Sequence, residues 1–438
     1  MPQYLSADEA AALLRPHDAL GLGLGPANPP ALLEALGRRR DWESLTIGGA
    51  LLLGLYDVLT HPAVEFRSGF FGPVERAYAQ MGHRIELVPG GFRQFGPILD
   101  RLHPRMVAVA ARVDADAGVV NLSLHHGATY EAIVAAGRDP QRLLVVEAND
   151  QLPWTASYGP EFTNEFPLDL VDVVIEASAP PFTLEEEEPS DDDLAVAEEA
   201  VRHIASGATL QTGIGTIPSV VATRLAEGAG EGYGIHSEMF TDGLRRLHAA
   251  GKVTNAHKGI FEGRSITTFA LGSAALYEFL DHNDEVAFLP VSTVNDSSVI
   301  ARNRHFVSIN GAISVDLYGQ IVAEAIDGRQ ISGVGGHEDF VAGAEFDVED
   351  TSLICMTSTA MVRGERRSRI VARHPKGTIV STPRQHTGLV VTEFGTADLR
   401  GLTVAERARC LSEVAHPEHR TALRSEARSF GRPPVATS

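Results

Sequence analysis

The sequence ATLQTGIGTIPSVVATRLAEG, residues 208–228, predicts a β-strand, a glycine loop and an α-helix in succession. ATLQTGIG has the apolar and β-branched character of a strand, and PSVVATRLAEG has the composition of a helix. Proline is tolerated at a helix start because that position needs no backbone donor. Glycines let the chain turn sharply and approach a ligand closely. The stretch therefore predicts an α/β fold.

The same succession occurs near the N-terminus. ADEAAALLRP predicts a helix, DALGLGL a strand, GPANP a turn and PALLEALGRR a second helix, within residues 7–39. In the second half, a predicted helix at 193–207 precedes the strand at 208–215. The recurrence after roughly 190 residues predicts two related α/β domains with mostly parallel sheets. We place the domains at residues 1–184 and 194–438.

An acidic segment, FTLEEEEPSDDD, lies between the two predicted domains. Its seven carboxylates and few apolar residues cannot bury a face, so residues 185–193 are predicted to be a solvated linker. The alternative is an acidic tail that binds a partner.

Composition excludes several classes of protein. The net charge of −20 argues against nucleic-acid binding, which depends on neutralisation of phosphates by Lys and Arg. The sequence contains no uncharged apolar run of about 18 residues and no signal-peptide pattern at its start. We therefore expect a cytoplasmic protein without membrane association. The two cysteines, Cys355 and Cys410, are predicted to be small buried hydrophobic residues.

Glu238 is the principal catalytic candidate. It lies in GYGIHSEMFTDG, residues 232–243, where a short strand pattern meets a turn. Open α/β sheets place their sites at the carboxyl ends of strands. A carboxylate there can serve as a base or as a nucleophile, and the alternative is a surface or helix-capping side chain. With an ordinary pKa near 4.3, Glu238 would be ionised at pH 7.

Two glycine loops are candidates for ligand binding. The loop TGIGTIP, residues 212–218, could present backbone N–H groups to a phosphate, although a tight turn would explain it equally. The loop GVGG, residues 333–336, could stabilise an oxyanion, with Asn310 as a further amide donor. Basic residues such as Lys258 are candidate phosphate contacts. No HExxH or similar spacing predicts a metal site, and no GxSxG motif predicts a serine hydrolase.

Six segments, taken in order, resemble the acetyl-CoA hydrolase/transferase family, and most closely the 4-hydroxybutyrate CoA-transferases among the class I CoA-transferases. RSGFFGPVERAYAQMGHRIELVP and VVEANDQLPWT extend the resemblance into the first half. The six segments are TGIGTIP, GIHSEMFTDG, SINGAISVDLYGQ, SGVGGHEDFVAGA, TPRQHTGLVVTEFGTADLRGLT and ERARCLSEVAHPEHR.

The resemblance implies two NagB/RpiA-like domains with the active site between them, in a homodimer. It implies that Glu238 is a nucleophile that forms an acyl-glutamyl anhydride and then a glutamyl-CoA thioester. Coenzyme A, as acyl-CoA, and a small carboxylate are the implied substrates, with no metal. The residues that we assign to oxyanion or substrate binding are Asn310, Gly335, Gly336 and His337, and those assigned to CoA are Gly213, Gly215, Thr216, Ile217, Pro218, Gly333 and Lys258.

His337 departs from the pattern, because many relatives carry Gln after the paired glycines. This departure bears on acyl specificity and not on the type of reaction. Three alternatives stay open: an acyl-CoA hydrolase that uses the same nucleophile, a sugar-phosphate isomerase that uses Glu238 as a base, and a catalytically silent acyl-CoA-binding protein.

Overall fold

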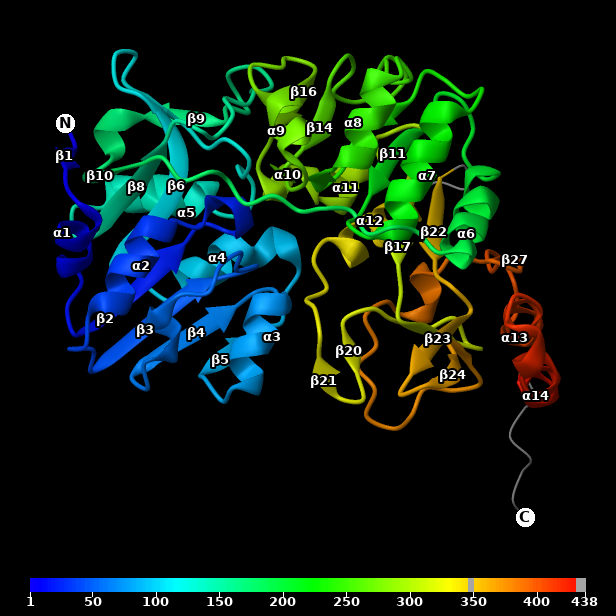
Figure 1. Ribbon diagram of the computed structural model, residues 1–438. Coiled ribbons are helices and arrows are strands. Elements are labelled where there is room, and N and C mark those ends of the chain that lie inside the picture. The colour runs from blue at the N-terminus through cyan, green and yellow to red at the C-terminus, as the bar shows by residue number, and fades with distance from the viewer. Residues whose placement is uncertain (346–349, 431–438) are drawn as a thin grey trace.

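Two separate sheets form the body of the protein, one in each half of the chain (Figure 1). The computed structural model describes residues 1–345 and 350–430. Helices and loops separate the strands in both halves, which confirms the expected α/β class. In the described residues, no helix is long and apolar enough to cross a membrane.

The first sheet has the strand order β1-β10-β8-β6-β2-β3-β4-β5, and all neighbours along this path are parallel. Its central strands are continuous apolar runs because helices and loops cover both faces. The strands are β1 (Gln3–Tyr4), β2 (His17–Leu22), β3 (Ser44–Gly49), β4 (Val64–Ser68), β5 (Ile85–Leu87), β6 (Met106–Asp114), β8 (Leu143–Asn149) and β10 (Val173–Ala177). In addition, β7 (Val119–Asn121) pairs antiparallel with β6, and β9 (Glu165–Pro167) pairs antiparallel with β7. The helices are α1 (Ala7–Ala12), α2 (Pro30–Arg38), α3 (Pro73–Gln80), α4 (Phe95–Asp100) and α5 (Tyr130–Arg138).

The second sheet has the order β12-β11-β17-β22-β26-β27, parallel except for β27. A parallel bridge between His236 and Ile266 continues it from β12 to the pair β14-β16. The strands are β11 (Thr209–Thr212), β12 (Gly234–Ile235), β14 (Ser265–Thr267), β16 (Val286–Phe288), β17 (Phe306–Gly311), β22 (Thr351–Cys355), β26 (Leu389–Thr392) and β27 (Gly395–Asp398). The helices are α6 (Asp191–Val201), α7 (Thr216–Glu227), α8 (Asp242–Ala249), α9 (Ala274–Leu280), α10 (Val291–Val294), α11 (Ser297–Ile300), α12 (His337–Gly343), α13 (Val404–Glu413) and α14 (Pro417–Ala427).

Short strands complete the second half outside this sheet. One pair, β13 and β15, begins directly after Glu238, and the others form small sheets between β17 and β26 (Figure 1). They are β13 (Met239–Phe240), β15 (Phe269–Ala270), β18 (Ser314–Asp316), β19 (Ile321–Val322), β20 (Ala325–Ile326), β21 (Arg329–Gln330), β23 (Thr359–Val362), β24 (Glu365–Ser368) and β25 (Ile370–Val371).

The two sheets have the same strand order. In the first, β10-β8-β6-β2-β3-β4-β5 are neighbours, and in the second β26-β22-β17-β11-β12-β14-β16 occupy the same places in the same chain sequence. The predicted strand-loop-helix units match as well, since β2 leads to α2 and β11 leads to α7. This correspondence supports the predicted relationship between the halves. The exact domain boundaries stay a prediction, and residues 431–438 of the second domain lie outside the described part.

The acidic segment is exposed to solvent, and it is anchored at both ends. It crosses between the halves (Figure 1), and the Leu184 amide donates to the Gly272 carbonyl over 2.9 Å. Ser190 caps α6, and its hydroxyl accepts from the Asp193 amide while the Asp193 carboxylate accepts in return. Helix α6 therefore begins at Asp191, before the predicted domain start at residue 194. The carboxylates 191–193 favour this first turn because they face the positive end of the helix dipole.

Candidate active site

Glu238 extends from the carboxyl end of β12 into a cavity of about 330 Å³. Its backbone is held firmly, because the Glu238 carbonyl accepts from the amides of Thr268 (3.0 Å) and Phe269 (3.2 Å). The Thr267 hydroxyl donates to the same carbonyl over 3.0 Å. The segment 267–269 thus fixes the backbone position from which the Glu238 side chain extends.

Both halves of the chain line this cavity. The first half contributes apolar side chains from segments that follow β2, β3 and β4, and the second half contributes the ends of β11, β12 and β17. The carboxyl ends of both sheets therefore border one site, as open α/β sheets favour. The lining residues are Leu24, Leu51, Phe70, Phe92, Gln211, Thr212, Gly213, Ile214, Glu238, Met239, Phe269, Asn310, Gly311, Ala312, Ile313, Ala323, Ser332, Gly333, Val334, Gly335, Gly336, His337 and Phe340.

The carboxylate of Glu238 has one direct side-chain partner among the described residues. Asn295 Nδ2 donates to Glu238 Oε2 over 2.6 Å and also lies 3.2 Å from Asp339 Oδ2. His236, which is fully buried, holds this arrangement together because its Nε2 lies 2.9 Å from the carbonyl oxygen of Val294, the neighbour of Asn295. His236 is therefore a structural residue, since burial lowers its pKa to about 3.

Burial raises the pKa of Glu238 to about 8; the Asn295 hydrogen bond opposes this shift, and the charge of Asp339 adds to it. This shift opposes the ionisation at pH 7 that an ordinary pKa near 4.3 would give Glu238. A carboxylate that loses its water is destabilised relative to the neutral acid unless enough donors replace that water. The single amide donor, Asn295, lowers the pKa of Glu238 by less than burial raises it. Burial likewise raises the pKa of Asp339, to about 6.

The GVGG loop lies directly against Glu238. A Cβ added at Gly336 would stand 1.9 Å from Glu238 Oε2 and 2.4 Å from Asn295 Nδ2, so only glycine fits there. Gly335 adopts φ +56°, in the left-handed region that favours glycine. Gly333 packs against the first half, where an added Cβ would lie 3.0 Å from the Gly69 carbonyl oxygen. The structure thus brings Gly335 and Gly336 to Glu238, whereas Gly333 lines the same cavity against the first half.

His337, the first residue of α12, lines the same cavity. Burial lowers its pKa to about 4, so the imidazole is neutral at pH 7. Its Nε2 is buried and has no hydrogen-bond partner among the described residues. A polar group on a bound substrate could therefore satisfy it.

Asn310 lines the cavity, but its amide donors are already engaged. Asn310 Nδ2 donates to Ser308 Oγ over 2.7 Å and to Gln211 Oε1 over 3.1 Å. Its Oδ1 accepts from Gln211 Nε2 over 3.4 Å. Asn310 therefore does not present a free N–H group to an oxyanion in this arrangement, because its two neighbours take both donors.

The TGIGTIP loop separates the Glu238 cavity from a second cavity of about 680 Å³. Gly213 borders both cavities, and Gly215 and Thr216 border the second. Gly215 has φ +133°, which a residue with a side chain rarely adopts. Ile217 and Pro218 are buried in the first turn of α7 and line neither cavity, so their proposed CoA contacts lack support from the geometry.

Lys258 does not reach either cavity, contrary to its proposed CoA contact. Its side chain is fully buried, and Nζ donates to the carbonyls of Ile235 and Arg264, each over 2.7 Å. Burial lowers its pKa well below the usual range. Lys258 therefore braces the strand β12 that carries Glu238. Because a lysine side chain is normally exposed, Lys258 was expected at the surface. No feature of the neighbouring sequence indicated that it is buried.

Sequence reasoning missed Asn295, Asp339 and the first-half residues of the cavity. Asn295 follows a short helix in PVSTVNDSS, a stretch without a recognisable motif. Asp339 lies next to the noticed GVGGH segment, so its position offered the one available signal. Within residues 1–345 and 350–430, no group of three or more His, Cys, Asp and Glu side chains is arranged to hold a metal ion.

Comparison with known proteins relates the chain to enzymes that act on CoA thioesters. The C-terminal domain of the acetyl-CoA hydrolase/transferase family matches residues 272–427. The chain is 37% identical to the probable butyrate:acetyl-CoA coenzyme A-transferase of Syntrophomonas wolfei, over 98% of this chain and 95% of the relative. It is 32% identical to the butyryl-CoA:acetate CoA-transferase of Anaerostipes caccae, over 96% and 95% of the two chains.

A solved structure agrees with these relatives. The crystal structure of 4-hydroxybutyrate CoA-transferase from Porphyromonas gingivalis matches with a TM-score of 0.78 and 28% identity, over 97% of each chain. The chain therefore belongs to the acetyl-CoA hydrolase/transferase family, which confirms the resemblance. The expected enzyme class, a CoA-transferase, is confirmed with it.

Proposed function

We propose that this enzyme transfers CoA from a short-chain acyl-CoA to a small carboxylic acid such as 4-hydroxybutyrate, with Glu238 as the nucleophile. The observation that carries the proposal is the buried carboxylate of Glu238 in a cavity between the two halves, with Gly336 packed directly on it. A carboxylate is a weak nucleophile, so it must be desolvated and held in line. Asn295 and the hydrogen-bonded backbone at the end of β12 hold the carboxylate in position.

The proposed transfer passes through two covalent intermediates on Glu238. A Glu238 carboxylate oxygen attacks the thioester carbonyl carbon, the carbon–sulfur bond breaks, and CoA leaves as the thiolate from an acyl-glutamyl anhydride. The thiolate attacks the glutamyl carbonyl carbon, and the first acid leaves as a carboxylate from a glutamyl-CoA thioester. The second acid takes CoA by the same steps in reverse, which gives ping-pong kinetics. The chemistry uses CoA as substrate and requires no metal.

Glu238 must be ionised before it attacks. Because burial raises its pKa to about 8, the neutral acid is favoured at pH 7 and must lose its proton before the attack. The same loss of water that raises the pKa makes the ionised group more reactive, since no solvent shell has to be removed. The binding energy of the remote parts of CoA supplies the cost of this arrangement.

The Gly335 and Gly336 amides are our candidates for the oxyanion donors, because their loop lies against the Glu238 carboxylate. One such donor typically stabilises the transition state by ~3 kcal/mol. Asn310 can contribute only if Gln211 and Ser308 release its amide. His337 lies where it can contact the acyl group or the acceptor. Gly213, Gly215, Thr216 and Gly333 are our candidates for backbone contacts with CoA.

A hydrolase is the second candidate, because the family description names both activities. In that case water attacks the enzyme-bound intermediate. The apolar side chains of Leu24, Leu51 and Phe70 in the cavity disfavour this outcome because they limit access of water to Glu238. The sugar-phosphate isomerase and the silent binding protein are less favoured, since the relatives are named as CoA-transferases and the family as hydrolases and transferases. Homodimeric assembly and a cytoplasmic location stay predictions.

The covalent intermediate provides the test. The protein is incubated with acetyl-CoA or butyryl-CoA without an acceptor, quenched in acid and analysed by intact mass and peptide mapping. We expect a CoA adduct on the peptide that contains Glu238, and none in Glu238→Gln. Transfer to added 4-hydroxybutyrate should exceed release of free CoA. An unmodified Glu238 peptide under turnover conditions would refute the mechanism, and free CoA release at equal or greater rate would favour the hydrolase.

A further inference from the structure

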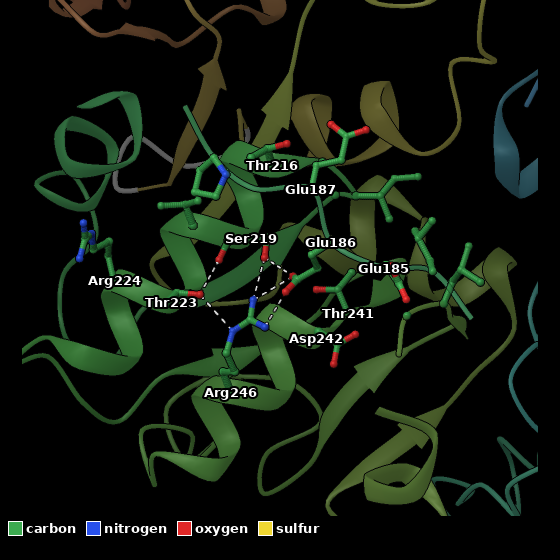
Figure 2. Close-up of a pocket in the computed structure, with 18 of the residues that line it drawn as sticks. Glu185, Glu186, Glu187, Thr216, Ser219, Thr223, Arg224, Thr241, Asp242 and Arg246 are labelled. Carbon is green, nitrogen blue, oxygen red and sulfur yellow. Dashed lines mark hydrogen bonds and ion pairs between the residues drawn. The ribbon is translucent and has the colours of Figure 1, made fainter. Parts of the chain in front are cut away.

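The cavity of about 680 Å³ beside the Glu238 site contains an unusual arrangement of charges. It lies between the acidic segment, α7 and the start of α8 (Figure 2). Glu185, Glu186, Glu187 and Asp242 line it, together with Arg224 and Arg246. The cavity borders Gly213 and Ile214, as does the Glu238 cavity, so a single extended ligand could contact both.

The guanidinium of Arg246 is oriented by two hydroxyl side chains of α7. Arg246 Nε donates to Thr223 Oγ1 over 3.0 Å, and Nη2 donates to Ser219 Oγ over 2.7 Å. Thr223 Oγ1 in turn donates to the Ser219 carbonyl over 3.0 Å, which fixes its own position. The outer edge of the guanidinium, Nη1 and Nη2, therefore faces the acidic segment. Such an edge matches the geometry of a carboxylate or a phosphate.

Glu186 occupies this edge. Arg246 Nη1 donates to Glu186 Oε2 over 2.7 Å, and Nη2 donates to Oε1 over 2.9 Å. The Ser219 hydroxyl donates to the same Oε1 (Figure 2). The Arg246 hydrogen bonds lower the pKa of Glu186, so its side chain is ionised. The Glu186 carboxylate thus accepts hydrogen bonds from three donors, namely Arg246 Nη1, Arg246 Nη2 and the Ser219 hydroxyl.

The segment that carries Glu186 can move without loss of a helix or strand. Residues 185–189 belong to neither kind of element, and they are anchored at Leu184 and at the Ser190 cap of α6. Among residues 185–189, all within the described part of the chain, Glu186 alone has a side-chain hydrogen bond or ion pair. The ion pair is also partly open to solvent, with 43% of the Glu186 side chain exposed.

The charge balance explains why displacement matters. With Glu186 in place, four carboxylates oppose two guanidinium groups in the lining, so the cavity repels a further anion. When Glu186 swings away, Arg246 and Ser219 regain free donors for phosphate oxygens. The N-terminus of the 12-residue helix α7, at Thr216, borders the same cavity and favours negative charge.

We propose that Arg246 and Ser219, oriented by Thr223, form a subsite for a phosphate of the CoA substrate, and that Glu186 occupies this subsite until the substrate displaces it. This inference rests on the proposed function, because it assumes that CoA binds with its thiol end at Glu238. Glu186 then competes with the substrate. It weakens the binding of CoA without taking part in the reaction at Glu238.

Binding of CoA, measured by calorimetry, tests the proposal. Glu186→Gln should bind CoA about fivefold or more tightly than the wild type, because the competing charge is removed. Arg246→Gln should bind it about tenfold more weakly, because the bidentate donor is lost, and Arg246→Lys should lie between. In the double variant E186Q/R246Q, the gain from E186Q should disappear. Glu188→Gln is the matched control, since it removes the same charge from the same segment but does not line the cavity.

Pantetheine, which carries the thiol but no phosphate, distinguishes the subsite from the rest of the pocket. Its affinity should be equal in all these variants. Equal effects of E186Q and E188Q on CoA, or unchanged CoA affinity in R246Q, would overturn the subsite even if the enzyme forms its glutamyl-CoA adduct. Failure of the wild type to form that adduct would instead refute the proposed function. Thermal melting of R246Q shows whether a loss of affinity reflects unfolding of the α7–α8 region.

Discussion

Asn295 Nδ2 donates a hydrogen bond of 2.6 Å to Glu238 Oε2, the one side-chain donor that this carboxylate has among the described residues. The bond joins the end of α10 to the end of β12. It favours the ionised form of Glu238, whereas burial and the charge of Asp339 favour the neutral form. The balance of these three influences sets the pH range in which the nucleophile is ionised.

Replacement of Asn295 should shift the activity to higher pH. Asn295→Ala removes the donor that lowers the Glu238 pKa, so this pKa should rise above about 8. In both proteins, kcat/KM should increase with pH as Glu238 ionises, and the midpoint should lie higher in the variant. The measurement is a profile of CoA transfer between about pH 6 and pH 10.

Asp339→Asn provides a control of opposite sign. Burial raises the Asp339 pKa to about 6, so Asp339 is charged near pH 8, where Glu238 titrates. Removal of this charge should lower the Glu238 pKa and move the midpoint to lower pH. Shifts of the two variants in the same direction would show that the profile reports another group.

The raised pKa of Glu238 also predicts a pH-dependent stability. Its pKa is about 8 in the folded protein, and we take the ordinary value of 4.5 for the unfolded protein. The stability that the neutral Glu238 side chain contributes to the folded protein is therefore fully present below about pH 4.5. It is lost as the pH rises to about 8. Glu238→Gln carries no such group. Its stability relative to the wild type should increase over this range and then level off.

Urea unfolding at pH 5 and at pH 9 measures this difference. Other buried acids, such as Glu75 and Glu147, also have pKa values raised to about 7 by burial. They affect both proteins equally, so the comparison cancels them. A constant difference between E238Q and the wild type at the two pH values would mean that Glu238 has an ordinary pKa.

Gly336 should not tolerate a side chain. In Gly336→Ala the new Cβ would lie 1.9 Å from Glu238 Oε2, so the carboxylate or the GVGG loop must move. We expect CoA transfer to fall by about 100-fold or more, because a misplaced nucleophile loses its alignment with the thioester. The rate of adduct formation at Glu238 should fall equally. Activity near the wild-type level would show that the loop lies elsewhere during the reaction.

Much of the fold could be predicted because its signals are local. The stretch at 208–228 contains an apolar strand, a Gly-x-Gly pair and a proline within one unit, and its copy near the N-terminus has the same order. Glu238 and the GVGG loop are candidates from short motifs in the same way, but the proposed role of Glu238 as a nucleophile comes from the family resemblance. Neither prediction needed knowledge of which segments meet in space.

The rest of the site depends on tertiary contacts that no local pattern encodes. Asn295 reaches Glu238 from 57 positions away along the chain, and Phe70 comes from the other half of the protein. The pKa of Glu238 depends on burial by all of these segments, so the sequence suggested an ordinary value. Asn310 was a reasonable donor by residue type, but Ser308 and Gln211 engage its amide.

Lys258 supplies a final prediction, because its buried position separates a structural role from a role in CoA binding. Lys258→Met keeps most of the side-chain volume but removes both hydrogen bonds to the carbonyls of Ile235 and Arg264. We expect a loss of about 1–3 kcal/mol in the free energy of unfolding. The KM for acyl-CoA should be unchanged in the folded enzyme, since Lys258 lines neither cavity.

Lys252→Met is the matched control. Lys252 is half-buried, and its Nζ donates to the Gly228 carbonyl over 2.8 Å in a hydrogen bond that is open to solvent. A surface substitution of this kind changes stability by about 0.5 kcal/mol or less. Urea unfolding should therefore separate the two lysine variants, while their CoA kinetics agree. If K258M instead raised the KM for acyl-CoA and unfolded like the wild type, Lys258 would contact CoA, and its bonds to Ile235 and Arg264 would have to break on binding.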